Sequence, residues 1–196
     1  MVLSIHCSIP GHDCGRIALL ADLEREKRYQ HQRAALTDPV TEVYTPRYFK
    51  RRLDEEIERS ARTGASTSIL YIDLDSFKRI NDDFGHAAGD KALRLAAEFI
   101  QRTVRLSDVV CRNGGGEFAV ILLETASEIA DSVGKRVQEL YPRHMESTEG
   151  LPEGMALSLS VGVSAIDGEA SADSLMKEAD DALYRDKRSR GKERGR

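Results

Sequence analysis

Three consecutive glycines, Gly114 to Gly116, stand directly before an apolar run that ends at Leu123. A run of this length bounded by glycines is typical of a strand that leaves a tight turn. Glycine lets the backbone take positive φ and, without a Cβ, lets a ligand approach closely. Glu117 follows the glycines and would bring a carboxylate to the turn. The segment alone fits an ordinary β-hairpin as well as a turn that cradles phosphate.

Apolar periodicity along the rest of the chain alternates between the helical and the strand type. Helical spacing predicts helices over residues 16–36, 47–62, 92–104, 126–141 and 175–183, with Pro142 ending the fourth. Short apolar or alternating runs predict strands over residues 68–74, 108–112, 117–123 and 157–164. This order predicts an α/β fold of the α+β type, in which helices pack on a mixed central β-sheet.

The chain is expected to divide into four parts. These are an irregular segment at 1–15, a linking or signalling helix at 16–36, a core-bearing domain at 37–188 and a basic tail at 189–196. Apolar residues thin out after Leu23, so the helix at 16–36 would be marginal by itself in water. Pairing with a second copy, or continuation from an upstream sensor domain, would explain this helix better.

The composition is that of a soluble globular protein, with 40% hydrophobic and 32% charged residues. A net charge of −4 gives no reason to expect nucleic acid or a membrane surface as a partner. No apolar run approaches the roughly 20 residues that span a bilayer, and no signal peptide is evident. The three cysteines make a poor disulfide framework, so a reducing cytoplasm is the expected setting.

A second motif runs from Asp73 to Asp90 and has the form D-x-D-x-F-K-x-I-N-D-x-x-G-H-x-x-G-D. Together with the GGGEF segment, it resembles the GGDEF family, the diguanylate cyclases of bacteria, which condense two GTP into cyclic di-GMP and two diphosphates. Asp38 to Thr41 resemble the family's opening motif, and residues 179–187 resemble its closing helix. The resemblance covers about residues 36–188 and implies a palm-like nucleotide-cyclase sheet with the signature on a β-hairpin.

The resemblance implies a site for Mg²⁺ or Mn²⁺. Its ligands would be Asp73, the backbone carbonyl of Leu74 and Glu117, and Asp73 and Glu117 would be the catalytic carboxylates. Divalent cations of this kind prefer oxygen ligands and would polarise the phosphate that the 3′-hydroxyl attacks. The third signature position, which is Asp or Glu in the family, is Gly116 here. Since a lost metal ligand costs several kcal/mol of transition-state stabilisation, we expect weak or absent turnover.

The residues that would recognise GTP match the family pattern more fully than the metal ligands do. By resemblance, Asn81 and Asp90 hydrogen-bond the guanine, which suits an amide that both donates and accepts and a carboxylate that accepts. The phosphates would meet Lys78, Gly114, Gly115 and Lys187. The arginine expected four residues after Lys187 is absent, since that position is Gly191, but Arg190 and Lys192 flank it.

A third motif is Arg105-Leu-Ser-Asp108, with five residues between Asp108 and Gly114. This offset matches the inhibitory site at which the family binds cyclic di-GMP as product, with Arg136 as a candidate second arginine. An arginine can grip phosphate or guanine with two hydrogen bonds, while an aspartate accepts from guanine N–H groups. Outside this context the pattern is a common surface pair.

Three functions stay open at this point. The favoured one is a degenerate cyclase that binds GTP, cyclic di-GMP or both. The second is an active diguanylate cyclase with product inhibition, and the third is a dimerising scaffold without a ligand. The resemblance also implies a homodimer, because each subunit would hold one of the two GTP molecules.

Overall fold

The computed structural model describes residues 22–25, 36–152, 154–166 and 170–194. The chain forms two compact units, residues 1–36 and residues 37–196. The irregular segment predicted at 1–15 and most of the helix predicted at 16–36 lie outside the described residues. Of that helix, residues 22–25 and residue 36 are described and are helical.

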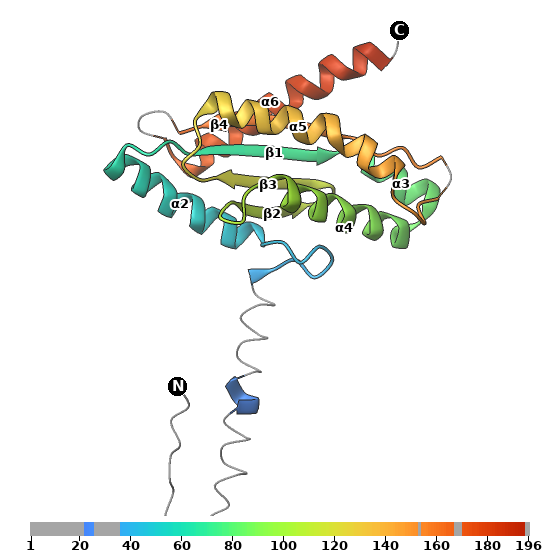
Figure 1. The fold of residues 1–196 in the computed structure, drawn as a ribbon, viewed down its shortest axis with the longest axis horizontal. Coiled ribbons are helices and arrows are strands. Elements are labelled where there is room, and N and C mark those ends of the chain that lie inside the picture. The colour runs from blue at the N-terminus through green and yellow to red at the C-terminus, as the bar shows by residue number, and fades with distance from the viewer. Residues whose placement is uncertain (1–21, 26–35, 153, 167–169, 195–196) are drawn as a thin grey trace, which may run out of the picture. The chain divides into compact units, whose positions relative to one another are not determined.

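The second unit contains four strands and five helices among its described residues (Figure 1). The strands are β1 Ser68–Leu74, β2 Val109–Gly114, β3 Glu117–Leu122 and β4 Leu159–Ala165. The helices are α2 Pro46–Thr63, α3 Phe77–Phe84, α4 His86–Thr103, α5 Ser127–Glu146 and α6 Ala172–Arg194. The α+β fold is therefore confirmed.

The sheet has the strand order β2-β3-β1-β4, and every neighbouring pair is antiparallel. The sheet is therefore antiparallel where a mixed one was predicted, because the order of helices and strands along the chain does not fix the direction in which strands pair. Among the described residues, the one parallel pairing is the isolated bridge between Tyr44 and Cys111. The central strand β1 covers the residues predicted for it, 68–74. Because β1 is covered on both faces, it is apolar at most positions and does not alternate with polar residues.

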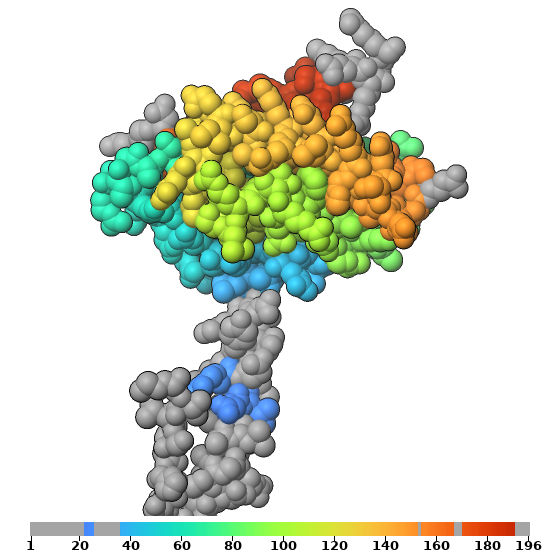
Figure 2. All heavy atoms as spheres, in the orientation of Figure 1, coloured from blue at the N-terminus to red at the C-terminus, as the bar shows by residue number. Residues whose placement is uncertain are grey.

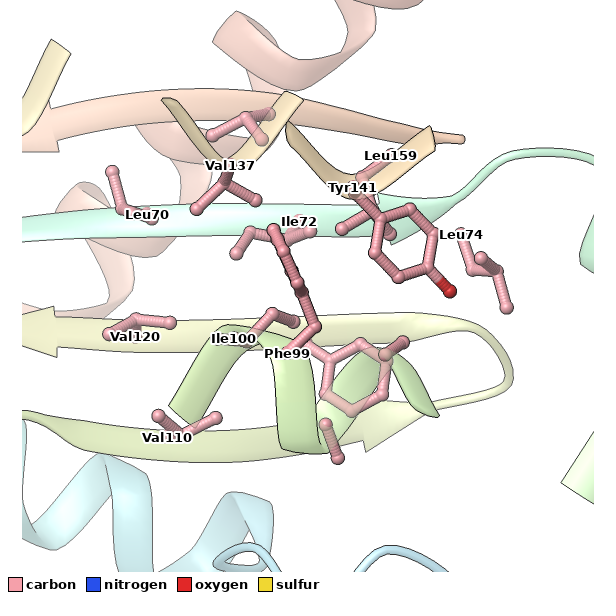
Figure 3. Close-up of a cluster of buried hydrophobic side chains, with 14 of the residues drawn as sticks. Leu70, Ile72, Leu74, Phe99, Ile100, Val110, Val120, Val137, Tyr141 and Leu159 are labelled. Carbon is pink, nitrogen blue, oxygen red and sulfur yellow. The ribbon is translucent and has the colours of Figure 1, made fainter. Parts of the chain in front are cut away.

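Side chains that alternate along β1 divide the core into two clusters. Leu70, Ile72 and Leu74 face the larger cluster, to which α4 and α5 contribute Ile100 and Tyr141 (Figure 3). Figure 2 shows α4 and α5 side by side over one side of the domain. The opposite face of the sheet packs on α2 and α6. The end of β1 is therefore held between helix layers and cannot shift freely.

Helix α5 continues through Pro142 to Glu146, so the prediction that proline would end this helix is wrong. Proline removes one backbone hydrogen bond and disturbs the preceding turn. Tyr141 and Met145 are both buried in the larger cluster, and this burial holds the last turn in place. Helix α6 also runs further than predicted, so residues 189–194 of the predicted basic tail belong to it.

Candidate active site

The β2–β3 hairpin turns at its glycines, and each glycine there has its own structural reason. Gly114 and Gly115 have φ values of 129° and 51°, a region that side chains rarely adopt. Gly116 is buried and has a different constraint, because a Cβ there would lie 2.9 Å from Cβ of Phe77 and 3.3 Å from Cβ of Leu74. The third signature position therefore has neither a side-chain oxygen nor ready space for one.

A salt bridge joins this hairpin to the segment before α2. Arg112 Nη1 donates to both carboxylate oxygens of Asp38, at 3.1 and 3.2 Å. Arg112 Nε and Nη2 donate to the carbonyl of Gly115, at 3.2 and 2.9 Å. One guanidinium thus fixes the glycine turn and ties it to the opening motif. Arg112 was assigned no role from its sequence position, although it stands only two residues before Gly114.

Hydrogen bonding sets the ionisation of Asp38. Burial alone would raise the pKa of this carboxyl, but hydrogen bonds from Thr41 and Arg112, together with the Arg112 charge, outweigh burial and lower the pKa. Asp38 accepts from the Thr41 N–H at 2.9 Å and from its hydroxyl at 2.8 Å. The ionised form is therefore the one that the folded domain stabilises.

Replacing Asp38 with Asn is expected to lower the free energy of unfolding by about 1–3 kcal/mol at pH 7, because charged hydrogen bonds are lost. A lowered folded pKa stabilises the fold above the unfolded pKa of about 3.9, and this stabilisation is lost as pH falls through the folded value. The difference in the free energy of unfolding between wild type and variant should therefore become smaller as the pH is lowered from 7 to about 3. Urea unfolding at both pH values measures it, with the exposed Asp131→Asn as control. An equal difference at both would contradict this account.

The two predicted catalytic carboxylates are direct neighbours on adjacent strands. Asp73 in β1 pairs directly with Glu117 in β3, so both side chains project to the same face. Lys187 from α6 forms an ion pair with Asp73, with Nζ 2.7 Å from Oδ2. Burial raises the pKa of Asp73, Lys187 opposes this, and the charges of Glu117 and Asp75 add to the rise. A cation beside Asp73 is thus already part of the folded domain.

An open pocket of about 450 Å³ lies at this end of the sheet. It brings together six of the predicted site residues, namely Asp73, Leu74, Lys78, Gly114, Gly115 and Glu117. Ser76, Phe77 and Gly116 complete the lining. Within the described residues, no three His, Cys, Asp or Glu side chains gather into a metal cluster. A cation held here would have two carboxylates and backbone oxygen from the protein.

The predicted guanine pair lies where α3 meets α4. Gly89, next to Asp90, has no Cβ, and an added one would lie 1.9 Å from Oδ1 of Asn81. The Asn81 amide therefore packs directly against α4, close to Asp90. Neither side chain has a hydrogen-bond partner within the part of the chain that the structure describes. The Phe77 ring lies near Gly89 and Phe77 Cβ lies near Gly116, so Phe77 links this pair to the pocket.

Asp75 fixes the turn between β1 and α3, a role that was not predicted from the sequence. Its carboxylate accepts from the hydroxyls of Ser158 and Ser160 at 2.5 and 2.6 Å, and its N–H donates to the Ser158 carbonyl at 2.9 Å. Arg190 lies 3.7 Å from the same carboxylate and donates to the Leu159 carbonyl at 2.5 Å. Arg190 is thus a cation close to the place where the family pattern would put one.

The R-x-x-D motif forms a turn directly after α4. Asp108 accepts from the backbone N–H of Arg105 at 2.8 Å and from that of Leu123 at 3.2 Å. Arg136 of α5 donates to the carbonyl of Thr103, two residues before Arg105, at 2.7 Å. Arg105, Asp108 and Arg136 therefore lie in one region. The side chains of Asp108 and Arg136 already hydrogen-bond to backbone groups there.

The four antiparallel strands, the helices on both faces and the glycine hairpin beside two facing carboxylates define an α+β domain with the palm-like fold of nucleotide cyclases. The family model described as "Diguanylate cyclase, GGDEF domain" matches residues 35–193. The chain belongs to this family, and the predicted membership is confirmed.

Several curated relatives are similar to the chain. Diguanylate cyclase DgcP of Pseudomonas aeruginosa is 36% identical over 158 residues, which cover 79% of this chain and 23% of that protein. Response regulator PleD of Caulobacter vibrioides is 37% identical over 156 residues, covering 79% and 34%. Diguanylate cyclase DosC of Escherichia coli is 37% identical over 180 residues, covering 91% and 38%. The chain thus spans well under half the length of these relatives.

Solved structures agree with the fold. The coiled coil and GGDEF domain of DgcB from Caulobacter crescentus, in complex with c-di-GMP, has a TM-score of 0.77 at 27% identity, covering 89% of this chain and 94% of that chain. Diguanylate cyclase SiaD from Pseudomonas aeruginosa, in complex with its activator SiaC, has a TM-score of 0.72 at 31% identity, covering 89% and 68%. None of the described helices is long and apolar enough to cross a membrane.

Proposed function

We propose that this domain binds guanine nucleotide in cyclic di-GMP signalling and that Gly116 impairs its turnover of GTP to cyclic di-GMP. The observation that carries the proposal is the geometry of position 116. The pocket keeps Asp73 and Glu117 opposite each other, but a Cβ at 116 would lie 2.9 Å from Phe77. A binding site is therefore retained while one carboxylate of the family's metal clamp is missing.

The donor set fits Mg²⁺ or Mn²⁺. These cations take oxygen ligands, commonly one or two carboxylates with water and substrate phosphates completing the shell. Asp73, the Leu74 carbonyl and Glu117 would hold the ion, and the ammonium of Lys187 beside Asp73 marks a position that favours positive charge. The bound ion would supply charge stabilisation at the α-phosphate.

The remaining pocket residues would hold GTP. Asn81 and Asp90 would hydrogen-bond the guanine edge, since their polar groups have no partners among the described residues. Gly114 and Gly115 would admit the phosphates beside Lys78, because nothing stands within 4 Å of where their Cβ atoms would be. When nucleotide and cation bind together, Lys187 would release Asp73 and form an ion pair with a phosphate.

Two measurements on the same preparation test the proposal. Calorimetry with GTP and Mg²⁺ should show saturable binding with a preference over ATP. Incubation with GTP and Mg²⁺, followed by chromatography, should show little cyclic di-GMP. Robust product formation would overturn the impairment, and the absence of any nucleotide binding would overturn the proposed function and favour the dimerising scaffold.

Replacing Asp90 with Asn is expected to weaken GTP binding about tenfold or more. The carboxylate would accept two guanine N–H groups, and each hydrogen bond to a charged partner contributes about 1.5–3 kcal/mol. Calorimetry measures the change, and Asp82→Asn, an exposed acid of α3, provides the matched control. Equal affinities for wild type and the Asp90 variant would remove Asp90 from the guanine site.

A second candidate is an active cyclase with product inhibition. The direct pairing of Asp73 with Glu117 favours it, because two carboxylates on one face could hold a cation without a third. The similarity of the chain to relatives named diguanylate cyclase is consistent with this candidate. The same chromatographic assay separates this candidate from the first.

Cyclic di-GMP would bind at Arg105, Asp108 and Arg136. Replacing Arg105 with Ala should weaken binding of cyclic di-GMP at least about tenfold, because a charged bidentate contact is lost, while GTP binding stays unchanged. The backbone contacts of Asp108 hold the turn and do not involve the exposed Arg105 side chain. Calorimetry measures both ligands, with the neighbouring Arg102→Ala as control. Unchanged micromolar affinity in the Arg105 variant would refute this site.

A homodimer and an upstream sensor complete the proposal. Joining two GTP molecules needs two copies of the pocket to face each other, because each copy would hold one nucleotide. The segment before residue 37 would connect the domain to a sensor, and the cytoplasm is the expected location. Sedimentation velocity with and without GTP tests the pairing.

A further inference from the structure

The hairpin contains a β-bulge whose extra residue is Asn113. Arg112 pairs with Phe118 and Gly114 pairs with Glu117, so Asn113 has no opposite residue in β3. Bulges frequently re-aim a side chain beside an active site. Here the bulged residue lies four positions before Glu117, the carboxylate on which the proposed chemistry depends.

The Asn113 amide makes two contacts at the site. Its Nδ2 donates to the hydroxyl of Tyr71 and to Oε2 of Glu117, the latter at 3.4 Å. Tyr71 lies two residues before Asp73 on the same face of β1, and only 6% of it is exposed. Asn113 therefore connects the buried side chain of Tyr71 to the carboxylate of the flexible Glu117 side chain.

The Asn113 amide nitrogen has two hydrogens, one for each of these contacts. The Tyr71 hydroxyl accepts one of them, and the burial of Tyr71 keeps that acceptor in place. The other hydrogen points to the Glu117 carboxylate, so Asn113 presents a donor to Glu117 from a fixed position.

We infer that Asn113 and Tyr71 are positioning residues that hold the Glu117 carboxylate opposite Asp73, an inference that rests on the proposed function. An unrestrained glutamate has rotamer freedom that it must lose to bind a cation. Anchoring one carboxylate oxygen through Asn113 removes part of that loss in advance and leaves the other oxygen for the ion. A merely structural asparagine would stabilise the hairpin but would not act through Glu117.

A double-mutant cycle tests this inference with Mn²⁺ as the probe. Calorimetry measures Mn²⁺ binding to the full chain, to Asn113→Leu, to Glu117→Gln and to the double variant. Asn113→Leu keeps a similar shape but no donor, and should weaken Mn²⁺ binding about tenfold in the wild-type background, the usual size of such outer-shell effects. In the Glu117→Gln background, the same change should have less than about a twofold effect.

Tyr71→Phe is the second variant, because it removes only a hydroxyl and keeps the buried ring. Like Asn113→Leu, this change should weaken Mn²⁺ binding in the wild-type background. It should have little effect when it is combined with Glu117→Gln. Equal losses in both backgrounds would overturn the positioning role while leaving the proposed function intact. GTP binding without any Mn²⁺ binding would also overturn it. A chain that binds neither GTP nor Mn²⁺ would overturn the proposed function itself.

Discussion

Replacing Gly116 with Asp is expected to raise cyclic di-GMP formation by about a hundredfold or more. The change returns a carboxylate to the third signature position, beside the Leu74 and Glu117 end of the pocket. A restored metal ligand contributes several kcal/mol to transition-state stabilisation, and each 1.36 kcal/mol is about tenfold in rate. Initial rates with GTP and Mg²⁺, measured by chromatography beside wild type, give the result.

The same substitution should cost stability. The new Cβ would lie 2.9 Å from Cβ of Phe77, so the start of α3 must shift before any side chain fits at 116. Overpacking of this kind costs about 1–3 kcal/mol. Phe77 is only partly buried and borders the pocket, which gives it a direction in which to move. A lower unfolding temperature together with faster turnover is therefore the expected combination.

Gly116→Ala is the matched control for the Asp variant. Alanine introduces the same Cβ against Phe77 but no oxygen, so it should lose similar stability and gain no turnover. Equal rates in the Asp and Ala variants would show that space at this position, and not a missing carboxylate, controls the reaction. A wild-type rate as high as that of the Asp variant would instead support the active-cyclase alternative.

Local patterns predicted most of the fold because they are densely specified. The run at 68–74 has the length and composition of a buried strand, and it occupies the residues predicted. The glycine turn likewise needs residues that accept positive φ, and Gly114 and Gly115 have it. The family resemblance named six residues that the structure brings together around one pocket.

Contacts between distant parts of the chain could not be predicted in this way. Arg112 meets Asp38 across 74 positions, and Ser158 meets Asp75 across 83. No local periodicity encodes such pairs, since they depend on strand register and helix packing. Pro142 is a case in which burial of its neighbours outweighs a local helix-breaking preference.

Replacing Gly162 with Ala is expected to reduce the free energy of unfolding by about 3 kcal/mol or more. Gly162 lies in β4 against α6, and an added Cβ would lie 2.1 Å from the carbonyl oxygen of Ala179 and 2.3 Å from the backbone nitrogen of Leu183. Backbone atoms cannot rotate away, so α6 would have to move. Because α6 carries Lys187 to Asp73, GTP affinity should fall together with stability. Urea unfolding and calorimetry measure the two effects.

Gly134→Ala separates this clash from any general effect of adding a methyl group near β4. Gly134 of α5 faces the opposite side of the strand, where an added Cβ would lie 3.2 Å from Cγ1 of Val161 and 3.4 Å from Cγ2 of Val163. These are side-chain ends that can adjust, and alanine also favours the helix by about 1 kcal/mol. The Gly134 variant should therefore stay within about 1 kcal/mol of wild type. Comparable losses in both variants would mean that α6 does not pack on β4 through its backbone.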